Sequence, residues 1–444
     1  MKCSFLIVGA GLAGIFTAYK LYKMGYDVVL VEKNSQVGGL LRTMRYVDSK
    51  GNVYLFDIGP HLPPRNKIWE NLCREVENVR LPYTSLKHRL KLGNHDILFP
   101  ISLKEATNIP FRLSLRLLKS YLESLMVGRN EVNVEDCLIN KFGVTFYRDY
   151  LRDYIYRFWR LPVHFISKDF DIRIPSISLK NLIRSLKPVH VPRTARTNSP
   201  NNILYPMYGV GEVVKPMVNK LMDNSEVKLN TIVKQISPSS SKLLVRLKEP
   251  SSTTEYSFDS IIWTGSLFDI TRLLGLTSYR KLSYRKLLIV NCAVEREDLL
   301  GEDIVDSYIM SPEIIFHRVY EPKKFSPKMA PPSRSSVCIE ITIAGHMEKM
   351  VPYLIEKSIK QLQRLYNLAS SEVRYLGYEI IENAYPVLFV NYKSQVNEIT
   401  SNLQKKNMYL IGRTGRYQYI GIQNVLEEVV QFLQMLSGNR SNLL

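Results

Sequence analysis

The N-terminal residues combine short apolar runs with a segment of helical spacing. The run SFLIV occupies residues 4–8, apolar positions at helical spacing follow over 12–24, and a second apolar run covers 27–31. A short continuous apolar run is typical of a buried parallel strand, whereas apolar positions every three or four residues are typical of a helix. The pattern predicts a strand, a helix and a second, parallel strand.

Both patterns continue along the chain. Stretches rich in Leu, Arg and Tyr predict helices over 102–127 and 136–160, and an amphipathic helix is expected over 422–434. The prolines within 321–335 predict an irregular surface loop. Further strands are expected at 227–236, 243–248, 258–265, 284–295, 336–344 and 408–411.

Composition excludes several classes of protein. The chain has 444 residues, of which 45% are hydrophobic and 23% charged, so we exclude a disordered chain, a collagen-like repeat and a coiled coil. The length suggests two or three domains. No apolar run reaches the ~18 residues of a transmembrane helix. The five cysteines form no CxxC pair, which favours reduced thiols and a cytoplasmic protein.

The net charge of +19 is unusual. Such a charge is compatible with nucleic acid, an anionic membrane surface or an acidic substrate as partner. The basic residues are spread along the chain, and no run resembles a recognition helix, zinc finger or RNA-binding sheet motif. We therefore favour a solvated basic surface, with no specific nucleic-acid partner and with peripheral membrane contact left open.

A glycine-rich turn joins the first strand to the first helix. Gly9, Gly11 and Gly14 form the pattern G-x-G-x-x-G, and Glu32 lies 18 residues after Gly14. Gly9 permits a tight turn, Gly11 lets a pyrophosphate approach the helix N-terminus, and Gly14 allows close helix–sheet packing. A carboxylate at Glu32 can accept both hydroxyls of an adenosine ribose. We predict an FAD or NAD site here, with loop and packing glycines as the alternative.

A second glycine pair follows Glu32. The segment Val37–Thr43 reads VGGLLRT and resembles the GG-x-x-x-[ST] element of the FAD-dependent amine-oxidase superfamily. The resemblance implies FAD rather than NAD, with the backbone of Gly38 and Gly39 close to its pyrophosphate. It also implies that Arg42 reaches a phosphate or the flavin edge, an exposed loop arginine being the alternative. No cysteine lies near the C-terminal motif, so we expect non-covalent FAD.

Three more segments resemble this superfamily. Residues 53–61 read VYLFDIGPH, and the family's D-x-G-P-H turn implies that His61 lies near the isoalloxazine ring, a structural histidine being the alternative. Residues 205–212, YPMYGVGE, resemble a segment near the substrate pocket. Val233 begins a V-x-x-I pattern whose first backbone contacts the adenine in the family, although a core valine would look the same.

Residues 158–186 resemble a segment of flavoproteins related to protoporphyrinogen oxidase and UDP-galactopyranose mutase. Arg160 replaces the usual glycine after the tryptophan, so the local turn is expected to differ, and a core role is the alternative for the tryptophan. The matching residues are Trp159, Pro162, Ser167, Asp169, Arg173, Ile174 and Ser178.

The C-terminal segment 412–419, GRTGRYQY, resembles the same two groups. In the mutases its Arg and Tyr side chains clamp a nucleotide-sugar diphosphate, and an arginine fork suits a diphosphate or carboxylate. The resemblance implies that Arg416 and Tyr417 bind an anionic group in the cleft while Arg413 lies nearer the cofactor; a solvated cation is the alternative for Arg416. Residues 62–65, LPPR, lack a second histidine of the mutases, which weakens that assignment.

A last helix begins after this segment. The resemblance implies that its N-terminus, at Gly421, Ile422 and Gln423, points at the flavin pyrimidine edge and stabilises negative charge on the reduced ring.

The sequence thus predicts an α/β fold with a Rossmann-like FAD-binding domain and a discontinuous α+β substrate domain. We assign residues 1–72, 204–275 and 378–444 to the first domain and 73–203 and 276–377 to the second. The expected function is an FAD-dependent oxidoreductase acting on a small, anionic substrate. The alternatives are a mutase-like flavin-dependent nucleotide-sugar isomerase and an FAD-binding protein without turnover. The oligomeric state stays open.

The candidate site residues fall into two groups. The expected catalytic residues are His61, Arg416 and Tyr417. The expected cofactor-binding residues are Gly9, Gly11, Leu12, Ala13, Gly14, Glu32, Lys33, Gly38, Gly39, Leu40, Arg42, Gly59, Pro60, His61, Val233, Gly412, Arg413, Gly421, Ile422 and Gln423, and no metal ligands are expected.

Overall fold

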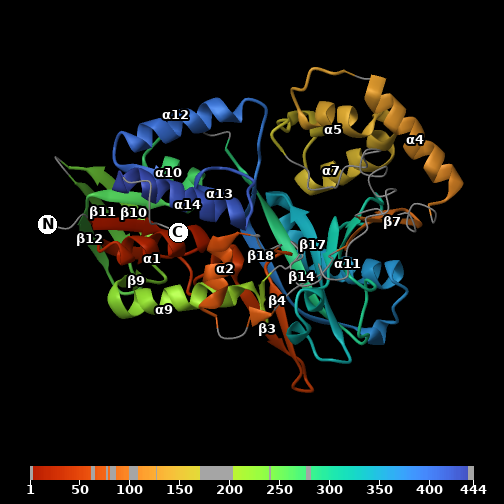
Figure 1. Ribbon diagram of the computed structural model, residues 1–444, viewed down its shortest axis with the longest axis horizontal. Coiled ribbons are helices and arrows are strands. Elements are labelled where there is room, and N and C mark those ends of the chain that lie inside the picture. Colours follow the sequence, from red (N-terminus) through yellow and green to blue (C-terminus); the bar gives the residue numbers. More distant parts are fainter. Residues whose placement is uncertain are drawn as a thin grey trace, which may run out of the picture.

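The computed structural model describes most of the chain (Figure 1). Among the described residues no helix is long and apolar enough to cross a membrane. The sequence expectations for residues 62–65 and 102–108 and for Arg173, Ile174 and Ser178 lie outside the described residues. The described ranges are 4–61, 66–76, 79–80, 87–99, 109–126, 128–170, 204–239, 242–276 and 282–438.

A five-stranded sheet carries the glycine turn. Its strand order is β19–β13–β1–β2–β9, and all neighbouring strands are parallel. The sheet therefore combines strands that lie far apart in the sequence, because parallel neighbours are joined by crossover connections. The strands are β1 (Ser4–Val8), β2 (Asp27–Val31), β9 (Glu226–Lys228), β13 (Ser260–Trp263) and β19 (Met408–Leu410).

Successive side chains of β1 enter two separate cores. Phe5 and Ile7 pack with the helices α1, α9 and α14, whereas Leu6 packs with a three-stranded antiparallel sheet and with α10 and α12. A strand covered on both faces needs a continuous apolar run, which explains SFLIV. The elements are α1 (Leu12–Lys23), α9 (Lys215–Asn224), α14 (Ile422–Ser437), β10 (Ile232–Pro238), β11 (Leu243–Lys248), β12 (Thr253–Phe258), α10 (Leu267–Leu273) and α12 (Tyr392–Gln404).

A seven-stranded sheet forms the second half of the molecule, in the order β18–β14–β17–β16–β15–β6–β7. On β14, Leu287 and Ile289 join the core shared with the first half, whereas Leu288 and Val290 pack under α11 (Val351–Leu365). One face of this sheet is thus turned toward the glycine turn. The strands are β6 (Lys87–Leu92), β7 (His95–Phe99), β14 (Tyr284–Val294), β15 (Ile304–Ile309), β16 (Arg318–Tyr320), β17 (Ser335–Ile343) and β18 (Val373–Pro386).

A group of helices lies beyond the seven-stranded sheet, with α4 at the outer edge of the molecule (Figure 1). The sequence pattern predicted one long helix over 136–160, and this expectation is wrong. The first helix ends at Gly143, whose φ is +81°; a Cβ there would lie 1.9 Å from the Ser120 carbonyl oxygen, so the close approach requires glycine. The elements are α4 (Phe111–Met126), α5 (Val134–Phe142), α6 (Val144–Phe146), a π-turn at Tyr147–Leu151 and α7 (Arg152–Trp159).

Short elements connect these layers. The expected domain boundary at residue 378 falls inside β18, which runs unbroken to Pro386, so we place that boundary after the strand. The short elements used below are η1 (Gly39–Leu41), β3 (Thr43–Val47), β4 (Val53–Asp57), α2 (Lys67–Arg74), β5 (Val79–Arg80), β8 (Tyr205–Pro206), η5 (Val210–Val214), η7 (Pro322–Lys324), η8 (Pro327–Met329) and α13 (Gly412–Gly415).

Candidate functional site

The three glycines of the first turn are required for three different reasons. Gly9 has a φ of +102°. A Cβ on Gly14 would lie only 1.9 Å from the Gly9 carbonyl oxygen, so helix α1 can approach the turn only with glycine there. Gly11 is different, because a Cβ on it would meet only the Gly39 Cα, at 3.9 Å. The folded chain thus has room for a side chain at Gly11. The absence of one leaves this space open to a bound ligand.

The N-terminus of α1 has no capping side chain. Gly11 is its N-cap residue, no side chain accepts a hydrogen bond from the helix there, and its first turn contains no acidic residue. The first N–H groups of a helix lack partners within the helix, and its dipole favours negative charge at this end. The turn is therefore suited to a phosphate group, with Leu12 and Ala13 supplying backbone N–H donors.

The second glycine pair packs against the first turn. The Gly38 N–H donates to the Ala10 carbonyl oxygen at 2.7 Å, and a Cβ on Gly39 would lie 2.9 Å from the Gly11 Cα. Arg42 stabilises this loop, since its Nε donates to the Gly39 carbonyl oxygen at 3.1 Å.

Glu32 lies at the end of β2 and is buried. Its Oε2 accepts the Ala10 N–H at 2.8 Å, and its Oε1 accepts the backbone and side-chain N–H groups of Asn34 at 3.0 and 2.9 Å. The carboxylate is thus held beside the glycine turn by the chain itself. The next residue, Lys33, is exposed.

A second helix repeats the arrangement of α1. Gly421 is the N-cap residue of α14, again with no capping side chain and no acidic residue in the first turn. The backbone angles of Gly421 (φ −95°, ψ −178°) are close to those of Gly11 (φ −79°, ψ −178°). The two helices pack against each other. Ile422 is buried, and the Gln423 side chain donates to Glu427 at 2.9 Å.

The segment ending at His61 joins the two halves of the molecule. Asp57 is buried and accepts hydrogen bonds from the Thr43 hydroxyl, the Tyr205 hydroxyl and the Val210 N–H. Burial raises the pKa of this carboxyl to about 6. Beyond it, the Gly59 N–H donates to the Tyr320 hydroxyl at 3.1 Å. The turn containing Gly59 and Pro60 is therefore fixed between η5 of the first half and β16 of the second.

His61 contacts the glycine loop and lies within the electrostatic range of two arginines. Its Nε2 donates to the Leu40 carbonyl oxygen at 2.8 Å. Burial, with smaller contributions from the charges of Arg413 and Arg318, lowers the pKa of the His61 ring to about 4, although two backbone hydrogen bonds oppose the shift. The ring is therefore neutral at pH 7, with its proton on the nitrogen that faces Leu40.

Arg413 and Arg416 have different environments. Arg413 donates from Nη2 to the Ala384 carbonyl oxygen at 2.5 Å, and its guanidinium lies over the rings of Tyr419 and Tyr385, 4.5 and 5.4 Å from their centres. Arg416 instead forms a 3.0 Å ion pair with Glu428 of α14, and 43% of its side chain is exposed. Glu428 also accepts the Gly412 N–H at 3.1 Å. The arginine that contacts the second sheet is therefore Arg413, and the expected binding roles of the two arginines stay predictions.

Tyr417 is part of a core. It is fully buried with a φ of +55°. Its hydroxyl lies 2.7 Å from the Ser283 carbonyl oxygen and 2.8 Å from that of Val387, and it accepts the Ser283 N–H. These contacts tie the C-terminal turn to the residue before β14 and the residue after β18, so they give Tyr417 a structural role. The expected catalytic role does not fit this environment.

Val233 and Trp159 are both buried. Val233 pairs with Leu247 beside a register irregularity in β10. Its expected contact with an adenine stays a prediction. Trp159 lies in the helical layer, where Arg285 donates to its carbonyl oxygen at 2.6 Å. The packing role is therefore the better interpretation of Trp159.

The sequence analysis missed a buried ion pair on the second sheet. Arg318 of β16 donates to Glu340 of β17 from Nε at 2.8 Å and from Nη2 at 3.0 Å. His317 Nε2 lies 3.5 Å from the same carboxylate. Glu340 is the one charged residue of the fully buried strand SSVCIEITI, and a charged residue inside a mostly apolar run was the signal that could have identified it.

The charges of this cluster persist over a wide pH range. Burial alone would raise the pKa of the Glu340 carboxyl, but the interactions with Arg318 and His317 together outweigh burial and hold that pKa below its ordinary value. Burial lowers the pKa of His317 to about 4, although Glu340 opposes the shift. At pH 7 the arginine and the glutamate are therefore charged and His317 is neutral.

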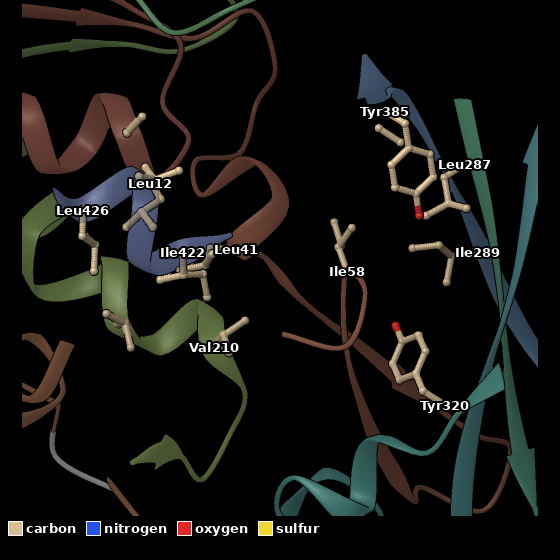
Figure 2. Packing of buried hydrophobic residues seen from close by; sticks show 14 of the residues in the cluster. Leu12, Leu41, Ile58, Val210, Leu287, Ile289, Tyr320, Tyr385, Ile422 and Leu426 are labelled. Carbon is tan, nitrogen blue, oxygen red and sulfur yellow. The ribbon is translucent and has the colours of Figure 1, made fainter. Parts of the chain in front are cut away.

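The cluster faces the glycine turns across a shared core. Figure 2 shows Leu12, Val210 and Ile422 on the side of the helices and Leu287 and Ile289 on the sheet. From the sheet side, the rings of Tyr320 and Tyr385 direct their hydroxyl groups toward one another, with Ile58 and Ile289 between them (Figure 2). This apolar boundary between two halves is the usual place for a bound cofactor ring and substrate.

The residues present fit a dinucleotide. A pyrophosphate requires free helix N–H groups and room to approach them, and Gly11 at the uncapped N-terminus of α1 provides both. A ribose requires a fixed carboxylate at the end of the second strand, and Glu32 provides it. The second bare helix end, at Gly421, adds another set of N–H donors.

Comparison with known proteins agrees with this geometry. Residues 7–76 match the family model of an NAD(P)-binding Rossmann-like domain. An L-amino acid oxidase of Cerastes cerastes is 29% identical over 163 residues, which cover 33% of this chain and 30% of the oxidase. The chain thus aligns with less than a third of the length of the curated relatives it matches.

Two solved structures share the fold along nearly the whole chain. Reduced UDP-galactopyranose mutase superposes with a TM-score of 0.82 at 19% identity, covering 98% of this chain and 94% of the mutase. Putrescine oxidase bound to putrescine superposes with a TM-score of 0.63 at 14% identity, covering 99% of this chain and 100% of the oxidase. Taken with the glycine turns and the two-sheet architecture, these matches show that the chain contains a Rossmann-like dinucleotide-binding domain and shares the fold of these two enzymes.

Proposed function

We propose that this protein is an FAD-dependent oxidoreductase that transfers a hydride from a small anionic substrate to the flavin. The proposal rests above all on the position of His61. Its ring donates to Leu40 in the glycine loop, and the charges of Arg413 and Arg318 act on the same ring. One neutral ring therefore connects the dinucleotide site with the buried charged cluster.

FAD, when bound without a covalent link, supplies a ring that accepts hydride at N5. The chain supplies the surroundings. Gly11 and the N-terminus of α1 hold the pyrophosphate, and Glu32 accepts the ribose hydroxyls. The N–H groups that follow Gly421 stabilise negative charge at the other end of the cofactor. The apolar side chains between the two halves exclude water from the reacting atoms.

An anionic substrate fits the charges at the junction. Arg318 and Arg413 carry two positive charges, Glu340 carries one negative charge, and His61 and His317 are neutral at pH 7. These five groups therefore have an excess positive charge. We assign Arg413, whose guanidinium lies over the rings of Tyr385 and Tyr419 at this junction, to a carboxylate or phosphate of the substrate.

A mutase-like isomerisation of a nucleotide sugar is the second candidate. It is favoured by the stacking of Arg413 on Tyr419 and Tyr385, since an arginine flanked by tyrosines suits a diphosphate as well as a carboxylate. It is disfavoured by the engagement of Arg416 with Glu428, which removes the second arginine of the expected clamp.

The cofactor is tested with Gly11→Ala. A Cβ at Gly11 has its nearest neighbour at 3.9 Å, and so does a Cβ at Gly345, which makes Gly345→Ala the matched control. Both variants should fold, but only Gly11→Ala should lose the yellow cofactor. The cofactor released from wild type by acid should be FAD. Equal FAD retention by the two variants would contradict the proposed site.

The reaction is tested with the FAD-loaded protein under anaerobic conditions. Bleaching of the flavin absorbance by a carboxylate- or phosphate-bearing substrate supports the oxidoreductase. Isomerisation of a nucleotide sugar only after dithionite reduction, with no net oxidation, supports the mutase. Tight FAD with neither reaction identifies a binding protein without turnover. A cytoplasmic location remains part of the proposal, and it is supported by free thiols at Cys73, Cys137, Cys292 and Cys338.

A further inference from the structure

Helix α4 exposes an apolar stripe on the outside of the molecule. Its side chains are Leu and Met with one Phe, and each is between 48% and 85% exposed. At about 100° per residue, they fall within an arc of roughly 100° on the helix surface. The residues of this stripe, named the α4 stripe below, are Phe111, Leu115, Leu118, Leu122, Leu125 and Met126.

The stripe is opposite the face that anchors the helix. Leu113 and Ser120 are buried, and the Ser120 hydroxyl donates to the Phe142 carbonyl oxygen and accepts the Phe146 N–H. On the same helical projection, the buried face is centred about 180° from the stripe. The α4 stripe therefore lies outside the core that holds α4 in place. A contiguous exposed apolar surface of this kind indicates an interaction surface.

Basic residues run along one edge of the stripe. Arg112, Arg116 and Lys119 are exposed and lie between the stripe and the buried face. Arg116 is 3.8 Å from Asp149 and Lys119 is 3.9 Å from Glu123. Such long, exposed ion pairs are weak, so the basic groups can also face an anionic surface.

We propose that the α4 stripe docks the protein on an anionic lipid bilayer. A helix with an apolar face flanked by Arg and Lys lies in the interface of a membrane, with its apolar side chains among the acyl chains and its cations at the headgroups. The net charge of +19 complements an anionic leaflet over the whole molecule. A second copy of this chain would bring like charges together, because the same basic edge would be present on both partners.

Cosedimentation with vesicles tests the proposal. FAD-loaded protein is mixed with vesicles of pure phosphatidylcholine or of phosphatidylcholine with phosphatidylglycerol. Wild type should bind the anionic vesicles and should bind the neutral ones at least about tenfold more weakly, because each basic residue near the surface adds about 1 kcal/mol. The binding should weaken with added salt.

Two pairs of variants separate the apolar and the basic contributions. Leu118→Glu with Leu122→Glu should reduce vesicle binding at least about tenfold. The control is Met222→Glu with Phe268→Glu, two exposed apolar residues elsewhere that change the net charge equally, and it should retain much more binding. Arg112→Gln with Arg116→Gln should weaken binding to anionic vesicles more than Lys349→Gln with Lys360→Gln. Circular dichroism and thermal melting should be unchanged in all four, since every site is exposed.

Three results would overturn the proposal. Wild type could fail to bind anionic vesicles at low salt. The stripe variant could bind as well as the Met222 and Phe268 control. Alternatively, light scattering could reveal a dimer that dissociates in the stripe variant without any vesicle binding, in which case the stripe is a contact between copies of this chain. These results are independent of the reaction at the flavin.

Discussion

The guanidinium of Arg413 lies 4.5 Å from the centre of the Tyr419 ring. Arg413 follows strand β19, and the cation–π contact turns its side chain toward the second sheet. The neighbouring Arg416, only three residues later, turns to the other side and pairs with Glu428. One short turn thus presents one arginine to the junction of the two halves and uses the other to hold helix α14.

The two arginines should therefore differ in ligand binding. Arg413→Ala should weaken the binding of inorganic pyrophosphate to the FAD-loaded protein about ten- to a hundredfold, because a charged hydrogen-bond partner is worth ~1.5–3 kcal/mol. Arg416→Ala should change the affinity by less than about threefold, in keeping with an ion pair that is part-exposed. The change in flavin absorbance on titration measures both. A larger loss in Arg416→Ala would restore the clamp expected from the sequence.

Gly14 should be indispensable for folding. In Gly14→Ala the Cβ would lie 1.9 Å from the Gly9 carbonyl oxygen, so α1 must move away from β1. We expect a loss of about 3 kcal/mol or more in the free energy of unfolding, or no folded protein. Gly128→Ala is the control, since a Cβ there has no neighbour within 4 Å, and it should stay within about 0.5 kcal/mol of wild type. Urea unfolding provides the comparison, and equal stabilities would show that the turn adapts.

Glu32 should act through its charge. Glu32→Gln keeps the size and one acceptor oxygen for the Ala10 N–H, so the apoprotein should remain folded. The loss of a charge-assisted hydrogen bond to the ribose should weaken FAD binding about ten- to a hundredfold. Asp27→Asn, at the exposed start of the same strand, removes an equal charge and should leave FAD binding unchanged. Fluorescence titration of the three apoproteins with FAD measures these affinities. Unchanged FAD binding in Glu32→Gln would exclude the ribose contact.

Buried His317 should make the protein less stable in mild acid. Its pKa is about 4 in the folded protein and has an ordinary value of 6.5, so between these values the unfolded chain binds more protons. The free energy of unfolding should therefore fall as the pH falls from about 6.5 to 4, by up to about 3 kcal/mol from this residue. Above pH 6.5 the residue should contribute no pH dependence.

Urea unfolding of wild type and His317→Asn at several pH values isolates this contribution. Asp57 acts with the opposite sign, because its raised pKa of about 6 makes the folded protein bind the extra proton, and His61 acts in the same direction as His317. Asp57 and His61 are both present in His317→Asn, so their contributions to the pH dependence cancel when the variant is compared with wild type. The loss of stability between pH 6.5 and 4.5 should be smaller in His317→Asn than in wild type, and parallel curves would mean that His317 is protonated in the folded state.

The sequence by itself determined the local units of this protein. The run SFLIV, the glycines that follow it and Glu32 define a strand–turn–helix–strand unit because each requirement is met within a few residues. Strands β11, β14 and β17 were likewise predicted to within a residue, since apolar runs bounded by polar residues are local signals. The fold class follows from these units.

Only the tertiary structure decided which side chains meet. Arg318 and Glu340 are paired by the register of β16 and β17, and Arg413 meets Ala384 and Tyr385 of β18 from the turn after β19. The break at Gly143 depends on Ser120 of another helix, and the roles of Arg416 and Tyr417 depend on Glu428 and Ser283. Contacts of this kind join residues that are distant in sequence, so no local sequence pattern predicts them. They are determined by the register of the strands, the crossover connections between them and the packing of the helices, which form only when the whole chain folds.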